Sequence, residues 1–284
     1  MIHARPRPLI SLSSAVLLVL ACGGTTAAEP GPVKRKLLEG YGNLPLSFEA
    51  NEGQTDPAVK FLSRGPGYTL FLTSSEATLS LRQGKSGLRV LRMRIVGASP
   101  TPTVAGVEAL PGKSNYFVGN DPGKWRKGVR TFAKVEYRNV YPGVNLAYYG
   151  KQRQLEYDFV LSPGADPKAI DLAFDGAEAI AIDGAGELVL SMGGGEVRMH
   201  KPTLYQQRAG KREPVAGRYV RRATNRVGFE VAASATHPPG QDAGTIAAAP
   251  LVLKCAKSGC VQEGDSEGVT RAFVPAPSRS QLAR

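Results

Sequence analysis

The sequence is constrained most by an alternation of apolar and polar residues that recurs in short segments along most of the chain. In "QLEYDFVLS", residues 154–162, large apolar residues occupy every second position, which is the period of a half-buried β-strand and not of a helix. Comparable segments follow one another over residues 68–231, separated by turn residues such as Pro142-Gly143. Because the connections are short and no helical segment lies between them, neighbouring strands should pair antiparallel. The sequence therefore predicts an all-β fold of antiparallel sheets packed as a sandwich or barrel-like layers, and a division into two subdomains near residue 142 stays open.

One segment departs from this alternation. In "LRVLRMRIV", residues 88–96, Leu91, Met93 and Ile95 alternate with arginines, but the phase slips between Val90 and Leu91. A slip of one residue within a strand is typical of a β-bulge, and we expect one here. The next residues, 97–106, have no periodicity and predict a loop.

The first 28 residues have the composition of a bacterial export signal. A basic start is followed by an apolar run, residues 9–21, and then by small residues. At ~1.5 Å per residue this run is too short to span a hydrocarbon core of about 30 Å, so we expect cleavage. "VLAC" resembles a bacterial lipobox, apart from Leu20, and would make Cys22 the lipidated N-terminus. Alternatively, "TAA", residues 26–28, would let ordinary signal peptidase release a soluble protein.

The expected organisation comprises a signal peptide over residues 1–28, a linker over 29–43, a β-rich module over 44–231 and a low-complexity tail over 232–284. The tail is rich in Ala, Pro, Ser, Gly and Arg, which is typical of disorder, apart from "PLVLKC". We expect the protein to be exported, either as a membrane-anchored lipoprotein of the envelope or as a secreted protein. Contact with a membrane is expected through the lipid anchor.

The three cysteines fit an oxidising compartment. Cys22 goes to the lipid or leaves with the signal, so Cys255 and Cys260 remain as an even pair. A disulfide between these two residues, or two unpaired thiols in the tail, are both compatible with the sequence. No histidine lies close to them, so we expect no metal site.

No cofactor is expected either. "GVEALPGKS", residues 106–114, approximates the phosphate-binding GxxxxGK[ST] motif, but five residues separate Gly106 from Gly112 where the motif has four. The following "NYFVG" predicts a strand, whereas the motif requires a helix whose N–H groups bind phosphate.

The formal net charge of +12 does not indicate nucleic acid in an exported protein. The basic residues form several scattered clusters, one of them over residues 124–130. This pattern indicates a solvated surface, or adhesion to acidic polysaccharide or anionic lipid headgroups.

Glu156 and Asp158 are the candidate catalytic residues. They lie two residues apart on the polar side of a predicted strand, with Cα atoms about 6.7 Å apart at a rise of ~3.3 Å per residue. This spacing lies within the range of about 6.5–9.5 Å that inverting glycosidases use between carboxyl groups. The same alternation is, however, what any antiparallel strand with one wet face shows. We therefore expect both carboxylates to be solvated, and a carbohydrate-active hydrolase is the alternative.

Trp125 is the candidate ligand-binding residue. It is the only tryptophan of the chain, and Lys124, Arg126 and Lys127 flank it. On a loop, an indole among cations could stack on sugar rings or anchor a partner, because it is apolar with one polar edge. The alternative is a tryptophan that folds onto the sheet as a lid.

Several motifs together resemble a known family. They are "LPLSFEANEGQTDPAVKFLSRGPGYTLFLT", "LPGKSNYFVGNDPGKW", "VEYRNVYPGVNLAYYG", "QLEYDFVLSPGADP" and "GGEVRMHKPTLYQ". In this order they are similar to the N-terminal domain of unknown function that precedes SBBP-type β-propeller repeats in bacterial surface and secreted proteins. The resemblance covers residues 44–231 and implies an extracytoplasmic, β-rich, non-catalytic module, with no catalytic residues to carry over.

The sequence departs from that family after "VGFEV", residues 227–231. The relatives continue through another strand into the propeller, whereas this chain continues into "AASATHPPGQ". "PLVL", residues 250–253, would supply the missing strand; otherwise an edge stays open for pairing with another chain. The sequence thus favours a surface module that binds polysaccharide or surface proteins, with a structural remnant of a truncated SBBP-repeat protein as a further alternative.

Overall fold

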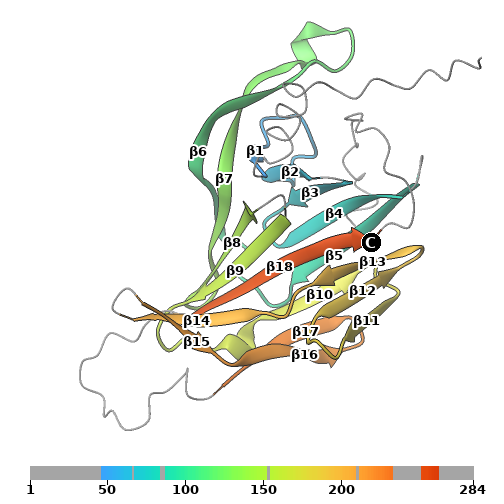
Figure 1. Ribbon diagram of the computed structural model, residues 1–284. Helices are drawn as coiled ribbons and strands as arrows, with labels where there is room; N and C mark the ends of the chain where they lie inside the picture. Colours follow the sequence, from blue (N-terminus) through green and yellow to red (C-terminus); the bar gives the residue numbers. More distant parts are fainter. Residues whose placement is uncertain are drawn as a thin grey trace, which may run out of the picture. The chain divides into compact units, whose positions relative to one another are not determined.

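Eighteen β-strands and two short 3-10 helices make up the part of the chain that the computed structural model describes, and every strand pairing in it is antiparallel (Figure 1). The described residues are 46–65, 67–83, 87–151, 154–208, 211–232 and 251–261. The predicted signal peptide, the linker and Cys22 lie outside these ranges. The all-β antiparallel fold that the alternation predicted is therefore confirmed. In the described ranges, we find no helix with the length and apolar character needed to cross a membrane.

The sheet divides into two branches along one edge of the long strand β7 (Arg126–Tyr141). β6 (Thr103–Tyr116) pairs with the opposite edge of β7 and forms a long hairpin with it. On the dividing edge, β1 pairs at Thr131 and Phe132, whereas β8 pairs from Lys134 onward. The two branches leave this edge separately, so they can fold over each other.

The first branch contains eight strands in hydrogen-bonded order. These are β1 (Phe48–Ala50), β2 (Phe61–Gly65), β3 (Tyr68–Leu72), β4 (Glu76–Gln83), β5 (Gly87–Ile95), β10 (Asp171–Asp175), β17 (Arg226–Val231) and β16 (Gly217–Ala223).

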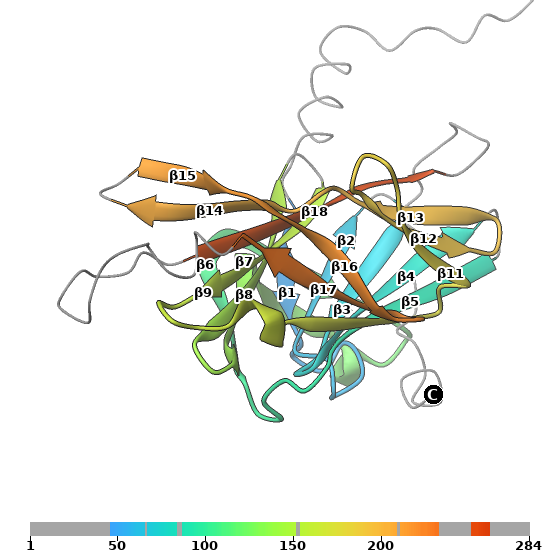
Figure 2. The same cartoon turned by 90° about the horizontal axis from the view of Figure 1, so that it is seen from below.

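The second branch runs from β8 (Val144–Lys151) through β9 (Gln154–Leu161) to β18 (Leu251–Val261) and then forks. One arm contains β14 (Thr203–Arg208) and β15 (Lys211–Val215); the other contains β13 (Gly195–Met199), β12 (Leu188–Met192) and β11 (Ala179–Ile182). Figure 2 shows β18 beside β14 at one end and extending toward β13 at the other. The 3-10 helices are η1 (Pro122–Lys124) and η2 (Pro167–Ala169).

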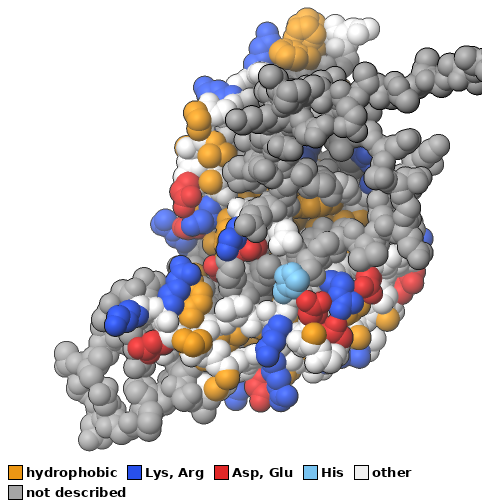
Figure 3. Space-filling model, in the orientation of Figure 1, with side chains coloured by type: hydrophobic (Ala, Val, Ile, Leu, Met, Phe, Trp, Pro, Cys, Tyr) orange, Lys and Arg blue, Asp and Glu red, His pale blue; other side chains and the backbone are white. Residues whose placement is uncertain are grey.

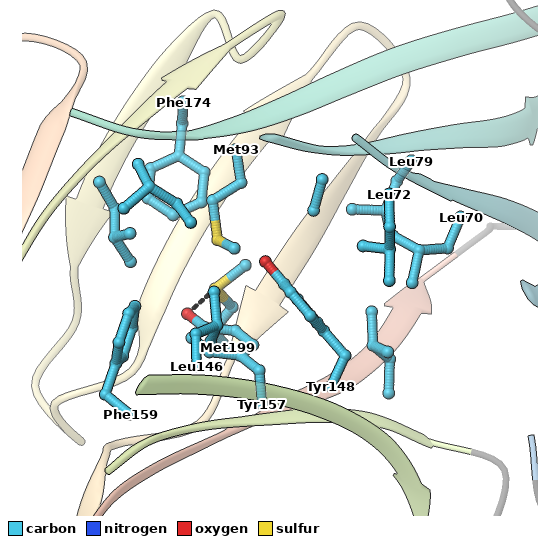
Figure 4. Close-up of a cluster of buried hydrophobic side chains, with 14 of the residues drawn as sticks. Leu70, Leu72, Leu79, Met93, Leu146, Tyr148, Tyr157, Phe159, Phe174 and Met199 are labelled. Carbon is cyan, nitrogen blue, oxygen red and sulfur yellow. Dashed lines mark hydrogen bonds between the residues drawn. The ribbon is translucent and has the colours of Figure 1, made fainter. Parts of the chain in front are cut away.

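The core lies between the two branches. From the first branch, Leu70, Leu72, Leu79, Met93 and Phe174 point toward Leu146, Tyr148, Tyr157, Phe159 and Met199 of the second (Figure 4). Phe159 of β9 and Phe229 of β17 contact each other across the branches, with ring centroids 6.1 Å apart. This face-to-face packing of two sheet surfaces is that of a sandwich.

The alternation in β9 is confirmed residue by residue. Leu155, Tyr157, Phe159 and Leu161 are all buried and belong to the core. In β5 the buried residues Leu91, Met93 and Ile95 alternate in the same way.

The expected β-bulge between Val90 and Leu91 is wrong. The register of β4 with β5 is unbroken there, with Ser80 opposite Val90 and Leu79 opposite Leu91. The apparent slip arises because Leu88 lies on the outer face and is 47% exposed, so it is not part of the buried series. In the described strands the register shifts lie instead in the pairings of β6 with β7, β7 with β8, β13 with β18 and β16 with β17.

Strand β18 lies inside the stretch predicted as a low-complexity tail. Its backbone pairs with β9, where Leu251 is opposite Leu161 and Ala256 is opposite Glu156. It extends to Val261, well past the "PLVL" that was expected to supply a strand. β18 covers the edge of β9 and joins it to β13 and β14, so this stretch contains part of the sheet.

Replacing Phe159 by Ala tests the core. We expect a loss of about 3–5 kcal/mol in the free energy of unfolding, because the removed ring leaves a cavity between the branches. Urea denaturation followed by circular dichroism measures it. Val160→Ala is the matched control: Val160 is the next residue, half-buried on the opposite face, and should cost about 1 kcal/mol. Equal losses in the two variants would contradict the assignment of Phe159 to the core.

Candidate functional site

Glu156 and Asp158 lie on the outer face of β9, opposite Tyr149 and Ala147 of β8. Glu156 is only 5% exposed and Asp158 is half-buried. The prediction that both carboxylates are solvated is therefore wrong for Glu156. The reason is the position of β9 in the sheet: β8 and β18 flank it on both sides, so the polar face of this strand is covered more than the face of an edge strand would be.

The hydroxyl group of Tyr149 donates a hydrogen bond to Asp158 Oδ1 at 2.8 Å. Burial raises the pKa of the Tyr149 phenol well above its usual value, and the charges of Asp158 and Glu156 raise it further. The phenol therefore stays protonated and keeps its role as a donor. Asp158 is held in this contact, and Glu156 is buried on the same face of β9.

Cys255 and Cys260 both lie in strand β18, opposite Tyr157 and Val197 respectively. Five residues of extended strand span about 16 Å at ~3.3 Å per residue. A disulfide needs Cα atoms within about 7 Å of each other. The backbone of β18 therefore does not bring the two cysteines together for the disulfide that the sequence suggested.

Trp125 lies at the far end of the β6–β7 hairpin, in the connection that we call the hairpin tip, residues 117–127. A single turn, η1, forms there because Asp121 accepts a hydrogen bond from the N–H of Gly123 at 2.9 Å. Trp125 follows this turn and is half-buried. Its ring packs edge-to-face against Phe117, with centroids 5.2 Å apart. Trp125 thus packs on its own hairpin, whereas a lid would have to pack on the sheet.

Phe117 and Val118 were not predicted from the sequence as site residues. "NYFVG" was expected to be a strand, but β6 ends at Tyr116 and the next two residues belong to the tip. Phe117 is 58% exposed and Val118 55% exposed. The available signal was the turn-forming "GNDPG" directly after them, which places two apolar residues just before a turn.

Basic residues accompany this apolar group in the tip. Lys124 and Lys127 are exposed. The ammonium group of Lys127 lies 5.6 Å from the ring centroid of Trp125 and 5.8 Å from that of Phe117. Lys124 and Asp121 form a loose ion pair at 3.8 Å. At the top of Figure 3, hydrophobic and basic side chains accordingly lie side by side at the end of the hairpin.

Two sets of contacts, which we call the clamp, hold the hairpin near its tip: Tyr116 with Glu49 and Arg64, and Arg130 with Glu52. The Tyr116 hydroxyl donates to Glu49 of β1, and Arg64 of β2 donates to Glu49 Oε1 at 3.0 Å and to the Tyr116 hydroxyl at 2.7 Å. On the other strand, Arg130 Nε donates to Glu52 Oε1 at 3.0 Å. Tyr116, directly before the tip, is therefore tied to β1 and β2, and Arg130, a little after it, is tied to Glu52.

The hairpin is also bent on the side of the clamp that lies away from the tip. Glu108 and Asn139 have left-handed backbones, with φ of 57° and 55°. Asn139 lies at the register shift of β7 with β8 between Tyr137 and Tyr141. Such bulges increase the local twist and curvature of a strand pair, and Figure 1 shows the hairpin curving away from β8.

No group of three or more His, Cys, Asp or Glu side chains in the described ranges could hold a metal ion. The tip has the exposed apolar and basic side chains of a surface contact.

The fold and the tip define an antiparallel β-sandwich domain with an exposed apolar and basic hairpin. The family model of a domain of unknown function, DUF7948, matches residues 48–239. The chain therefore belongs to the DUF7948 family. The match extends from β1 past β17 and ends before β18. No curated protein and no solved structure matches the chain.

Replacing Tyr116 by Phe tests the clamp. Loss of the hydroxyl should lower the free energy of unfolding by about 1–2 kcal/mol in urea denaturation, because Glu49 and Arg64 lose a shared partner. Tyr205→Phe is the matched control, since the Tyr205 ring lies under Arg212 at 4.7 Å and should keep that contact. No difference between the two variants would contradict the clamp.

The same variant has a defined pH dependence. Burial, followed by the hydrogen bond to Glu49, raises the pKa of Tyr116 to about 12. The unfolded chain ionises this phenol near pH ~10, so the stability it contributes is complete below that pH and is lost between pH ~10 and the folded pKa. The difference between wild type and Tyr116→Phe should shrink over this window.

Proposed function

We propose that this protein is a non-catalytic module of the bacterial cell envelope or surface, and that it attaches to its partner through the hairpin tip. The observation that carries the proposal is the exposure of Phe117 and Val118. The described residues include three exposed large hydrophobic side chains, and two of them are these neighbours; the third is Leu88 on β5. Adjacent exposed apolar side chains with a basic surround are typical of an interaction site.

Export is the second part of the proposal, and the sequence supports it. Residues 1–28 have the three regions of a signal peptide, and Cys22 ends the apolar run as in a lipoprotein. The protein would then be anchored at the envelope by acyl chains, or released by cleavage after residue 28. A net charge of +12 would favour acidic polysaccharide, anionic headgroups or acidic surface proteins as partners.

The likeness to domains that precede SBBP-type propeller repeats supports the same role. In that arrangement the module would hold or present other domains at the surface. A structural remnant of such a protein would lack a partner for the tip, so binding through the tip separates these two interpretations.

Carbohydrate hydrolysis by Glu156 and Asp158 is a second candidate, favoured by the burial of Glu156. The two carboxyl groups share one face of β9, and glycosidases flank the scissile bond with such a pair. Release of reducing sugar from envelope polysaccharide, lost in Glu156→Gln, would support this candidate over the first.

Lipidation is tested in living bacteria that express the full chain. With a clickable palmitate, we expect incorporation into the wild type and none into Cys22→Ala, because the thioether-linked cysteine is the acceptor. Label that persists in Cys22→Ala, or no label in either chain, would rule out lipidation at Cys22 and leave release by signal peptidase.

Attachment is tested by sedimentation with bacterial envelope fragments, using Cys22→Ala chains so that acylation does not contribute. The double variant Phe117→Ser/Val118→Ser should bind about tenfold more weakly or worse, because it loses the burial of two apolar side chains. Leu88→Ser is the matched control and should bind like the wild type. Equal binding by all three chains would contradict a role for the tip.

A further inference from the structure

We propose that the hairpin tip binds the surface of an anionic lipid bilayer, with Phe117 and Val118 in the headgroup and acyl boundary and lysines at the lipid phosphates. This inference rests on the proposed function and names the partner of the same site. It adds a second membrane contact to the N-terminal anchor expected from the sequence.

The geometry leaves the tip free to reach a flat surface. Within the described pairings, β7 contacts β1 from Thr131 and β8 from Lys134, whereas its pairing with β6 continues out to Arg126 opposite Tyr116. The last part of the hairpin is therefore a two-stranded ribbon that extends past the neighbouring strands (Figure 1). Phe117 and Val118 are at its end.

The polar groups of the tip suit the interface of a bilayer. The indole Nε1–H of Trp125 donates to the carbonyl of Gly119 at 3.2 Å, so its one polar atom is already satisfied within the tip. Tryptophan is enriched at the boundary between headgroups and hydrocarbon. The Phe117 and Trp125 rings can enter this boundary together, since they already pack against each other.

The charge of the tip selects anionic lipid. Lys124 and Lys127 are exposed residues of the tip, and Asp121 is its one acidic residue. Basic side chains beside an anionic leaflet each add favourable binding energy that falls off within a Debye length. Apolar insertion together with such a charge surround is the pattern of interfacial membrane binding.

The same observations disfavour the other partners. A sugar ring stacks on a free aromatic face, but the ammonium group of Lys127 lies near the faces of both Trp125 and Phe117. Stable protein interfaces bury about 1,200–2,000 Å² in total, which is much more than two exposed side chains at the end of a ribbon offer. A bilayer requires only a few inserted side chains and no complementary shape.

The clamp at the base of the tip favours insertion of Phe117 and Val118 into a bilayer. Tyr116 directly precedes Phe117 and is fixed to Glu49 and Arg64. Arg130 is fixed to Glu52 on the other strand. Because the ribbon is held on both strands, the apolar side chains stay presented and little conformational entropy is lost on binding.

The fluorescence of Trp125 tests the proposal on the full chain. It is the only tryptophan, so its emission reports the tip alone, whatever the N-terminal segment does. With vesicles of phosphatidylcholine and phosphatidylglycerol we expect a blue shift, protection from acrylamide and quenching by brominated lipid. With pure phosphatidylcholine vesicles the shift should be much smaller, and added salt should reduce it.

Variants identify the groups responsible. Phe117→Ser/Val118→Ser should abolish the shift, and Leu88→Ser, the matched apolar control, should leave it unchanged. Lys124→Glu/Lys127→Glu should weaken the partition into anionic vesicles by about tenfold or more, whereas Lys211→Glu on β15 should not. Unfolding curves in urea confirm that each variant is folded, and a shift that survives in Phe117→Ser/Val118→Ser would overturn the proposal.

The outcomes also separate this inference from the proposed function. A shift of Trp125 with a soluble acidic polysaccharide, without one on anionic vesicles, would overturn the lipid proposal and leave attachment through the tip intact. The same holds if envelope fragments bind through Phe117 and Val118 but protein-free vesicles do not. If neither fragments nor vesicles respond to the tip variants, both are overturned.

Discussion

The structure depends on the burial of alternate side chains between two branches of one sheet. Phe159 of β9 meets Phe229 of β17 across this interface, and the tyrosines of the core add hydrogen bonds to it: the Tyr137 hydroxyl donates to the carbonyl of Thr73 at 2.7 Å. Because neither branch can bury its apolar face alone, each stabilises the other. Strand β7 makes this possible, since its one edge pairs with β1 and then with β8.

The same strand also links the core to the surface. The C-terminal part of β7 contributes buried residues such as Val135 and Tyr137, while its first residues form half of the ribbon that carries the tip. The hydrogen bonds among Tyr116, Glu49 and Arg64 hold the tip end of this ribbon to β1 and β2. These contacts fix the end of the ribbon to the sandwich, and so Phe117 and Val118 stay exposed. In an unrestrained loop the same side chains would fold inward to bury their apolar surface.

The alternation of residues along the chain predicted which side chains share a face of a strand. It did not predict the burial of side chains that neighbouring strands cover. The burial of Tyr157 and Phe159 follows from alternation, and so does the antiparallel class of the fold. Glu156 was expected in water because strand alternation distinguishes two faces but does not show which neighbours cover each one. The phase slip at Leu88 was taken for a bulge because an exposed leucine and a buried one are identical in sequence. Trp125 was singled out from the sequence, but Phe117, which packs against it, was assigned to a strand.

The sequence by itself determined the fold class and the presence of a tryptophan among cations, since each depends on residue type and spacing along the chain. The tertiary structure decided which strands pair at a distance, and so placed β18 beside β9 and buried Glu156. It also decided that Phe117, Val118 and Trp125 share one exposed end. These features arise from contacts between residues far apart in the chain. Hydrophobic burial is not directional, so the packing of the whole domain determines which of these residues meet.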